Sequence, residues 1–209
     1  MKVVAINGSP KNKGNTHFAL STVGEVLIGE GIDFEILHVA RRPVFGCFAC
    51  RKCIENKDNK CSVNADGFND YLPAIMQADG LLLGSPVYYS GISGTMKCFL
   101  DRLFYVSGAN GNWMRHKIGA GVVAARRSGG SAALSGLNYY LTISEMTVAT
   151  SNYWSIIHGH RPDEAEQDTE GVQILKVLGA KMAWLLKTNK ENIDTAPQKV
   201  DKIFLNFVR

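Results

Sequence analysis

The sequence has no apolar stretch that approaches the roughly 20 residues of a transmembrane helix. The apolar run that precedes Asn7 is too short for the core of a signal peptide. Lysines and arginines form no dense stripe interleaved with aromatic residues, and the formal net charge is only +4, so nucleic-acid binding is not expected. We therefore expect a cytoplasmic protein whose partners include neither a membrane nor a nucleic acid.

The sequence also lacks internal repeats and low-complexity linkers. Its composition, with 45% apolar and 20% charged residues, is that of an ordinary globular protein. A chain of 209 residues can bury the core of one α/β domain. We expect a single domain over residues 1–209, with a cysteine-rich insertion at 40–66 and a helical extension at 188–209.

Strand and helix patterns alternate along the chain, which indicates a parallel sheet with helices on both faces. Strands are expected at residues 2–7, 32–39, 81–84, 118–124 and 148–154, and helices at 16–29, 67–77, 93–106, 132–146 and 165–187. The predicted fold class is α/β, a flavodoxin-like three-layer sandwich with a five-stranded parallel sheet of order 2-1-3-4-5. Ligands of such sheets bind at the carboxyl ends of the first and third strands. The loops after these strands are therefore the candidate site.

The first loop reads GSPKNKGNT and lies between a strand and a helix. It lacks the dinucleotide pattern G-x-G-x-x-G, and Asn15 stands where a triphosphate-binding loop needs lysine. Backbone N–H groups at the helix start, the hydroxyls of Ser9 and Thr16, and the Asn15 amide suit a single terminal phosphate such as that of FMN. The alternative is a plain strand–helix turn in which Asn15 or Thr16 caps the helix.

The second loop, SPVYYSG, follows the third strand. Tyr88 and Tyr89 could form a flat wall for a flavin ring, with the backbone of residues 87–91 as its hydrogen-bonding edge; the alternative is ordinary packing. In the third loop, RRSGGS, glycines permit close approach and an arginine could balance the negative charge of reduced flavin. Solvated arginines are the alternative there.

These three motifs resemble the NADPH-dependent FMN reductase family of flavodoxin-like proteins, as do Asn152–Trp154 and His158-Gly159. The similarity covers roughly the first 160 residues. By this resemblance Ser9, Lys11, Asn15 and Thr16 hold the FMN phosphate, Pro86, Val87, Tyr88, Tyr89 and Ser90 line the flavin, and Arg126, Arg127, Gly129 and Gly130 close the site. Such proteins are usually homodimers or homotetramers with flavin near a subunit interface. The helix around Asp101 and Arg102 is expected near that interface, and a surface ion pair is the alternative.

Four cysteines follow the spacing Cys47-x2-Cys50-x2-Cys53-x7-Cys61. Thiolates spaced in this way can wrap one [4Fe-4S] cluster, although the gap of seven and the lack of a following proline depart from the bacterial ferredoxin pattern. The run resembles the iron-sulfur flavoprotein branch of the family. Tetrahedral zinc is a second interpretation, and metal-free thiols are a third, because relatives without a cluster keep similar cysteines. Cys98 is expected to be a packed thiol, and His158 and His160 to be loop residues.

The resemblance implies an FMN-dependent oxidoreductase. Hydride would pass from NADPH or NADH to the flavin, and electrons would leave to a quinone, an azo compound, free flavin or a [4Fe-4S] cluster. No protein side chain is predicted to be catalytic. An electron carrier without nicotinamide activity is the first alternative, and a flavin-binding or zinc-stabilised interaction module is the second.

Overall fold

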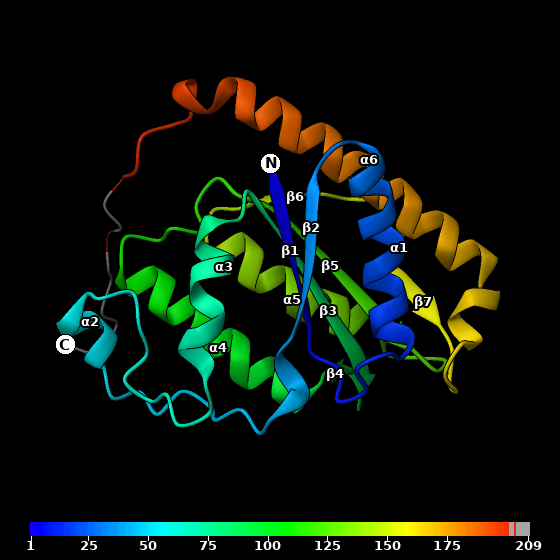
Figure 1. Ribbon diagram of the computed structural model, residues 1–209, viewed down its shortest axis with the longest axis horizontal. Helices are drawn as coiled ribbons and strands as arrows, with labels where there is room; N and C mark the ends of the chain where they lie inside the picture. Colours follow the sequence, from blue (N-terminus) through cyan, green and yellow to red (C-terminus); the bar gives the residue numbers. More distant parts are fainter. Residues whose placement is uncertain (201–202, 204–209) are drawn as a thin grey trace.

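A parallel sheet forms the centre of the molecule in the computed structural model, which describes residues 1–200 and 203 (Figure 1). Its main strands are β1 (Lys2–Asn7), β2 (Asp33–His38), β3 (Gly80–Tyr88), β5 (Ile118–Ala125) and β6 (Thr147–Val148), in the order β2-β1-β3-β5-β6. A short β4 (Gly91–Ile92) turns back antiparallel on β3, and β7 (Ile156–His158) pairs with β5. The predicted flavodoxin-like order is confirmed.

The fifth strand differs from the prediction, because residues 148–154 do not form one continuous strand. β6 pairs with the start of β5, where Thr147 faces Ile118, and β7 pairs with its end, where Ile156 faces Val123. Between them the chain leaves the sheet, and Tyr153 and Trp154 are more than half exposed. Aromatic residues favour strands mainly through packing, and this pair has no strand neighbour to pack against. The detour brings the end of β7 beside the carboxyl end of β5.

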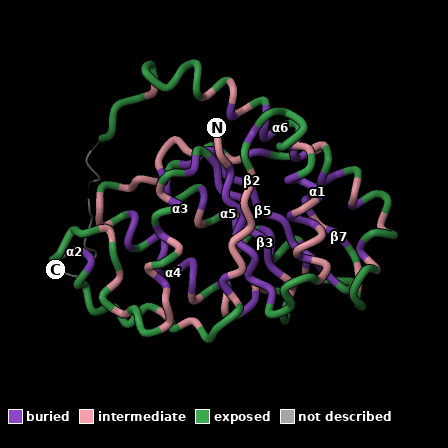
Figure 2. Tube along the Cα trace, viewed as in Figure 1, coloured by how far each residue is buried: buried purple, intermediate pink, exposed green. Residues whose placement is uncertain are grey.

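Helices cover both faces of the sheet (Figure 1). α1 (Asn15–Gly29) and α6 (Thr169–Asn192) pack on one face, and α3 (Leu72–Gln77), α4 (Gly94–Ala109) and α5 (Gly130–Ile143) pack on the other. Successive residues of β1 enter different cores: Val3 joins that of α1 and α6, and Val4 joins the other. A strand buried on both faces reads as a continuous apolar run, which explains why β1 was predictable. The central strands β1, β3 and β5 are buried over most of their length, whereas the edge strand β2 is only half-buried (Figure 2).

The segments outside this sandwich are short or irregular. The cysteine-rich segment contains η1 (Val39–Arg41) and α2 (Lys52–Asn56), is followed by η2 (Phe68–Tyr71), and packs through α2 against α4. A further turn, η3 (Glu164–Gln167), precedes α6. The last long helix continues to Asn192 rather than ending at Lys187, and is followed by η4 (Ile193–Thr195). The rest of the expected helical extension, from residue 201, lies outside the described residues, apart from residue 203. None of the described helices combines the length and apolar character needed to span a bilayer.

Candidate functional site

Direct hydrogen bonds join the loop after β1 to β3 and to the start of α4 at the carboxyl edge of the sheet. Gly8 N donates to Gly84 O at 2.9 Å, and Ser93 Oγ donates to Gly8 O at 2.7 Å. Ser93 N donates in turn to Ser85 Oγ at 2.9 Å, and the Ser93 hydroxyl also caps α4 by accepting from Met96 N. The sequence analysis did not single out Ser93 as a site residue, yet it fixes the first loop against β3 and the start of α4.

Asn7 shapes the first loop from within. Its side-chain oxygen accepts from Ser9 N at 3.0 Å, and its amide nitrogen donates to Asn12 O at 3.3 Å. Ser9 Oγ accepts from Lys11 N at 3.2 Å. Asn7 was also missed in the sequence, where the available signal was a polar residue ending a buried apolar strand. Its two bonds hold the loop in a compact turn before α1.

The amino end of α1 is left open by the protein. Gly14 is its N-cap residue, no side chain caps it, and its first turn contains no acidic residue. The alternative in which Asn15 or Thr16 caps the helix is therefore wrong. Asn15 Oδ1 is buried without a partner among the described residues, and Thr16 is buried. Free N–H groups at a helix start suit an anion.

Two histidines, His17 and His38, flank this turn. The His38 Nε2–H donates to Ser9 O at 2.7 Å, since a carbonyl oxygen can only accept. Burial lowers the pKa of His17, and the nearby Lys13 and His38 lower it further, so His17 is neutral at pH 7. The exposed Lys11 and Lys13 add positive charge near the loop.

The second predicted loop is largely strand. β3 continues to Tyr88, and only Tyr89 and Ser90 form the turn to β4, with φ of 48° and 61°. A two-residue turn with both φ values positive normally contains Asn-Gly, so Tyr-Ser here is strained, as residues at functional sites often are. Tyr88 is about half exposed and Tyr89 is fully exposed. Neither tyrosine is a core packing residue.

The third loop touches the second. Gly129 has a φ of +83°, and a Cβ there would lie 2.8 Å from Ser90 Cα. Arg126 and Arg127 are exposed, whereas Gly130 is buried at the start of α5, which has no side-chain cap either. The contact places the predicted flavin loop and the predicted closing loop next to each other.

A fourth segment completes the ring of loops. Gly159 follows β7, and a Cβ on it would lie 2.7 Å from Asn15 Nδ2, so its backbone packs directly on the start of α1. Gly159 N also donates to Ala125 O at 3.0 Å. The loops after β1, β3, β5 and β7 therefore form one continuous rim, which we call the loop ring.

A hollow of about 290 Å³ lies beyond the third loop, lined by Arg127, Tyr153 and Trp154 among others. His158 ends β7 rather than lying in a loop, and its Nδ1–H faces Asp168 Oδ2 at 3.2 Å. Asp168 also caps α6 by accepting from Gly171 N at 2.9 Å. Sequence analysis missed this pair, which is ten positions apart along the chain.

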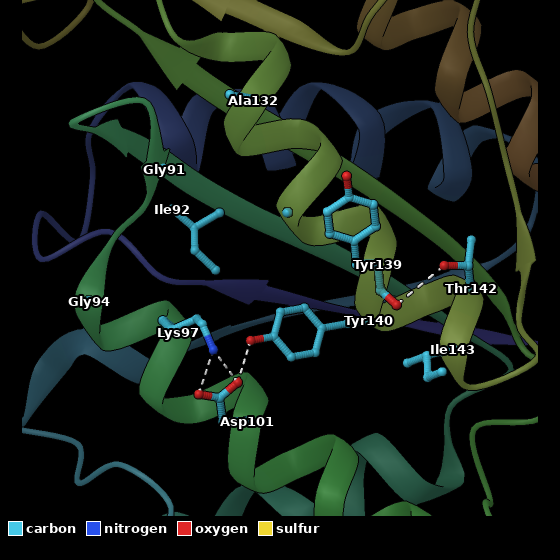
Figure 3. A pocket seen from close by; sticks show the side chains of 11 residues that line it. Gly91, Ile92, Gly94, Lys97, Asp101, Ala132, Tyr139, Tyr140, Thr142 and Ile143 are labelled. Carbon is cyan, nitrogen blue, oxygen red and sulfur yellow. Dashed lines mark hydrogen bonds and ion pairs between the residues drawn. The ribbon is translucent and has the colours of Figure 1, made fainter. Parts of the chain in front are cut away.

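A larger apolar groove of about 1070 Å³ runs between α4 and α5, beside β4 (Figure 3). On its floor Lys97 pairs with Asp101 at 2.6 Å, and the Tyr140 hydroxyl donates to Asp101. Burial and then the Asp101 carboxylate raise the pKa of Tyr140 to about 12. Asp101 thus lines the groove, on the helix that was expected near a subunit interface.

Arg102 contradicts the surface ion-pair alternative, because it is buried and pairs with Asp66 rather than Asp101. Its guanidinium also donates to Phe45 O at 3.3 Å and to Val63 O, and lies 4.0 Å over the Phe68 ring. Burial alone would raise the pKa of Asp66, but hydrogen bonds from Arg102 and from Phe45 N keep it below its ordinary value. The pair is therefore ionised at neutral pH.

All four cysteines of the run line a single small hollow of about 20 Å³, together with Arg102 and Tyr105. Cys53 is buried, Cys61 is half-buried, and Cys47 and Cys50 are exposed. Burial raises the pKa of the Cys53 thiol, whereas a hydrogen bond with Ser62 lowers that of Cys50. Cys98 does not line this hollow and is half-buried on α4.

The backbone around these cysteines is strained. Ala49, Arg51, Lys57 and Asn59 all have positive φ, between 49° and 62°, although none is glycine. Among the described residues, no three potential ligand side chains converge on one point as a single metal ion would require. All four cysteines nevertheless line the same hollow, two of them exposed and two at least partly buried.

Comparisons with known proteins show which family the sequence resembles. The family model for NADPH-dependent FMN reductase matches residues 1–161. An iron-sulfur flavoprotein of Methanocaldococcus jannaschii is 31% identical over 198 residues, covering 91% of this chain and all of that protein. An iron-sulfur flavoprotein of Methanosarcina thermophila is 26% identical over 196 residues, which cover 93% of this chain and all of that protein.

Solved structures share the fold. The WrbA-like flavodoxin of Agrobacterium tumefaciens superimposes with a TM-score of 0.61 at 15% identity, over 90% of this chain and 98% of that one. The match of residues 1–161 covers most of the 209-residue sequence. The chain therefore belongs to the NADPH-dependent FMN reductase family, as its loop motifs predicted.

Proposed function

We propose that the chain binds one FMN in the loop ring and transfers electrons from NADPH or NADH to an acceptor. The observation that supports this most is the open amino end of α1, held by the Asn7 and Ser93 hydrogen bonds against the end of β3. FMN, when bound, accepts a hydride and can release its electrons one at a time.

The protein's part is to bind and orient the flavin. Backbone N–H groups at the start of α1, with Ser9, Asn15 and Thr16, would hold the phosphate, and Lys11 would add positive charge. Residues 86–90 would line the ring, because the strained Tyr89-Ser90 turn exposes backbone groups and aromatic surface beside the third loop. Arg126 and Arg127 are exposed at the rim and would balance the charge of reduced flavin.

We further propose that Cys47, Cys50, Cys53 and Cys61 hold a [4Fe-4S] cluster, which would supply one-electron transfer. Four cysteines that line one hollow could each bind one iron of a cubane, and the relatives reported above are iron-sulfur flavoproteins. Zinc, with Zn–S bonds of about 2.3 Å, would draw all four sulfurs to one point. The strained, exposed backbone between residues 49 and 59 also fits a segment that wraps a group.

Helix α4 connects the two proposed sites. It starts at Gly94, directly behind the second loop, and Tyr105 and Val106 near its other end line the cysteine hollow. Eleven residues at 1.5 Å each separate Gly94 from Tyr105 by about 17 Å. Helix α4 would therefore set the distance between the proposed flavin site and the cysteine hollow.

We assign the α4–α5 groove to contact with a second copy of the chain, in a homodimer or homotetramer. Tyr139 and Ile143 on its rim are about 70% exposed, so they would offer apolar surface to a partner beside the groove. Five free cysteines fit a reducing compartment, so we place the protein in the cytoplasm.

Anaerobic reduction tests the proposed activity. NADPH or NADH should bleach the flavin absorbance of the purified holoprotein, and a quinone added afterwards should restore it. If photochemically reduced protein passed electrons to the quinone but neither nicotinamide bleached the flavin, the electron-carrier alternative would hold and the reductase activity would be rejected.

A further inference from the structure

We propose that Arg102 is a positioning residue of the cysteine site, whose Nε–H donates to a sulfur of the cluster while its other nitrogens hold both ends of the cysteine run. This inference rests on the cluster proposed above. It concerns a residue that the sequence motif does not contain, on a helix more than forty positions after the last ligand.

The first step is the position of Arg102 relative to the run. Its guanidinium donates to Phe45 O, two residues before Cys47, and to Val63 O, two residues after Cys61. All four cysteines therefore lie between two backbone anchors held by one side chain. Asp66, the ion-pair partner, accepts from Phe45 N at 2.9 Å and Phe68 N at 3.2 Å. The end of the run at Phe45 is therefore held twice, and the chain beyond Val63 is held at Phe68.

The second step is the cost of this arrangement. Arg102 is 1% exposed and the Asp66 side chain 2% exposed. A buried ion pair of this kind often adds little stability compared with apolar residues, yet breaking it is costly. Apolar residues could have anchored this irregular segment at a lower cost than the Arg102–Asp66 ion pair. The neighbouring thiols offer a reason for a buried charge at this place.

The third step concerns the Nε–H of Arg102, a hydrogen-bond donor without an acceptor. Arg102 Nε is buried and has no hydrogen-bond partner among the described residues, although both terminal nitrogens of the guanidinium are engaged. Arg102 lines the same hollow as the four cysteines. Leaving a buried donor unpaired is unfavourable. A cluster sulfur or thiolate in that hollow would accept from it.

Such a contact has a measurable electrochemical consequence. Hydrogen bonds to the sulfurs and nearby positive charge raise the reduction potential of an iron-sulfur cluster. Loss of a residue that orients metal ligands typically weakens metal binding by about 10–100-fold. A purely structural ion pair would change protein stability without a specific effect on potential.

The test uses Arg102→Lys in the full-length, anaerobically purified holoprotein. Lysine keeps a positive charge for Asp66, but it lacks the Nε–H and the guanidinium that donates to both Phe45 O and Val63 O. We expect the cluster midpoint potential, measured by redox titration with EPR detection, to become more negative. A chelator should remove iron about tenfold faster or more, with FMN content unchanged.

Two further variants separate the effect of positive charge from the effect of the Arg102 hydrogen bonds. Arg51→Met removes an exposed positive charge at the same hollow, and should shift the potential less than Arg102→Lys does. The double variant Asp66→Asn, Arg102→Gln replaces the ion pair by a neutral hydrogen-bonded pair, and should reproduce the faster iron loss even if Arg102→Lys alone folds poorly.

The outcomes are distinct. Loaded variants with the wild-type potential and the wild-type rate of iron loss would overturn the role of Arg102 and leave the cluster standing. A wild-type protein that retained FMN but neither iron nor sulfide would overturn the cluster itself, and this role with it.

Discussion

Replacing Gly129 by alanine is expected to weaken FMN binding by about tenfold to a hundredfold, which corresponds to about 1.4–2.7 kcal/mol. The new Cβ would lie 2.8 Å from Ser90 Cα, so it meets backbone rather than a side chain that can move aside. The third loop must then shift away from the Tyr89-Ser90 turn, and the two walls of the flavin site separate. Equilibrium titration of apoprotein with FMN, followed by quenching of flavin fluorescence, measures the loss.

Gly111→Ala is the matched control for this variant. Gly111 has a similar φ of +92°, but a Cβ on it would point into open space, with no neighbouring atom within 4 Å. Both variants should therefore lose about 1–2 kcal/mol of folding stability from the left-handed backbone, and only Gly129→Ala should lose flavin affinity. Equal FMN affinity in the two variants would show that the contact between the second and third loops does not form the flavin site.

Each of the substitutions Cys47→Ala, Cys50→Ala, Cys53→Ala and Cys61→Ala should abolish the cluster. Iron should fall from about four atoms per chain to near zero, because a cubane needs all four thiolates. Iron and sulfide analysis of anaerobically purified protein gives the count. FMN content should stay at one per chain in every variant, since the loop ring lies at the other end of α4.

Cys98→Ala is the control for these four variants. Cys98 also lies near the segment, with its sulfur 3.8 Å from where a Cβ on Gly46 would be, but it does not line the cysteine hollow. It should keep a full complement of iron. Retention of iron after loss of any of the four hollow-lining cysteines, or its loss in Cys98→Ala, would contradict the assignment. An iron-free wild-type protein would favour metal-free thiols.

The features predicted best from the sequence are the strands that are buried on both faces of the sheet, and the loops that follow them. β1 was bounded correctly because KVVAIN is an apolar run, and the three loops were found because they follow such strands. The fifth strand was placed wrongly because Tyr153 and Trp154 have strand propensity but are exposed. Strand propensity describes how well a residue packs within a sheet. The sequence does not show whether a neighbouring strand is present for Tyr153 and Trp154 to pack against.

Residues that act through long-range contacts were harder to find. Asp101 and Arg102 are adjacent in sequence and were interpreted as a pair, but consecutive residues on a helix do not face each other. Asp101 therefore joins Lys97 and Tyr140, while Arg102 reaches Asp66, 36 positions earlier. The periodicity of α4 could have separated the two side chains, whereas the identity of Asp66 as partner required the fold.

The central claim is that the open start of α1 holds the phosphate of FMN, and comparing FMN with riboflavin tests it most directly. Titration of the same apoprotein with both flavins isolates the phosphate, because the two ligands share ring and ribityl chain. One FMN should bind per chain, about a hundredfold tighter than riboflavin or more, since two charge-assisted hydrogen bonds of about 1.5–3 kcal/mol each would be lost. Equal affinities for the two flavins, or no binding of either, would contradict the account.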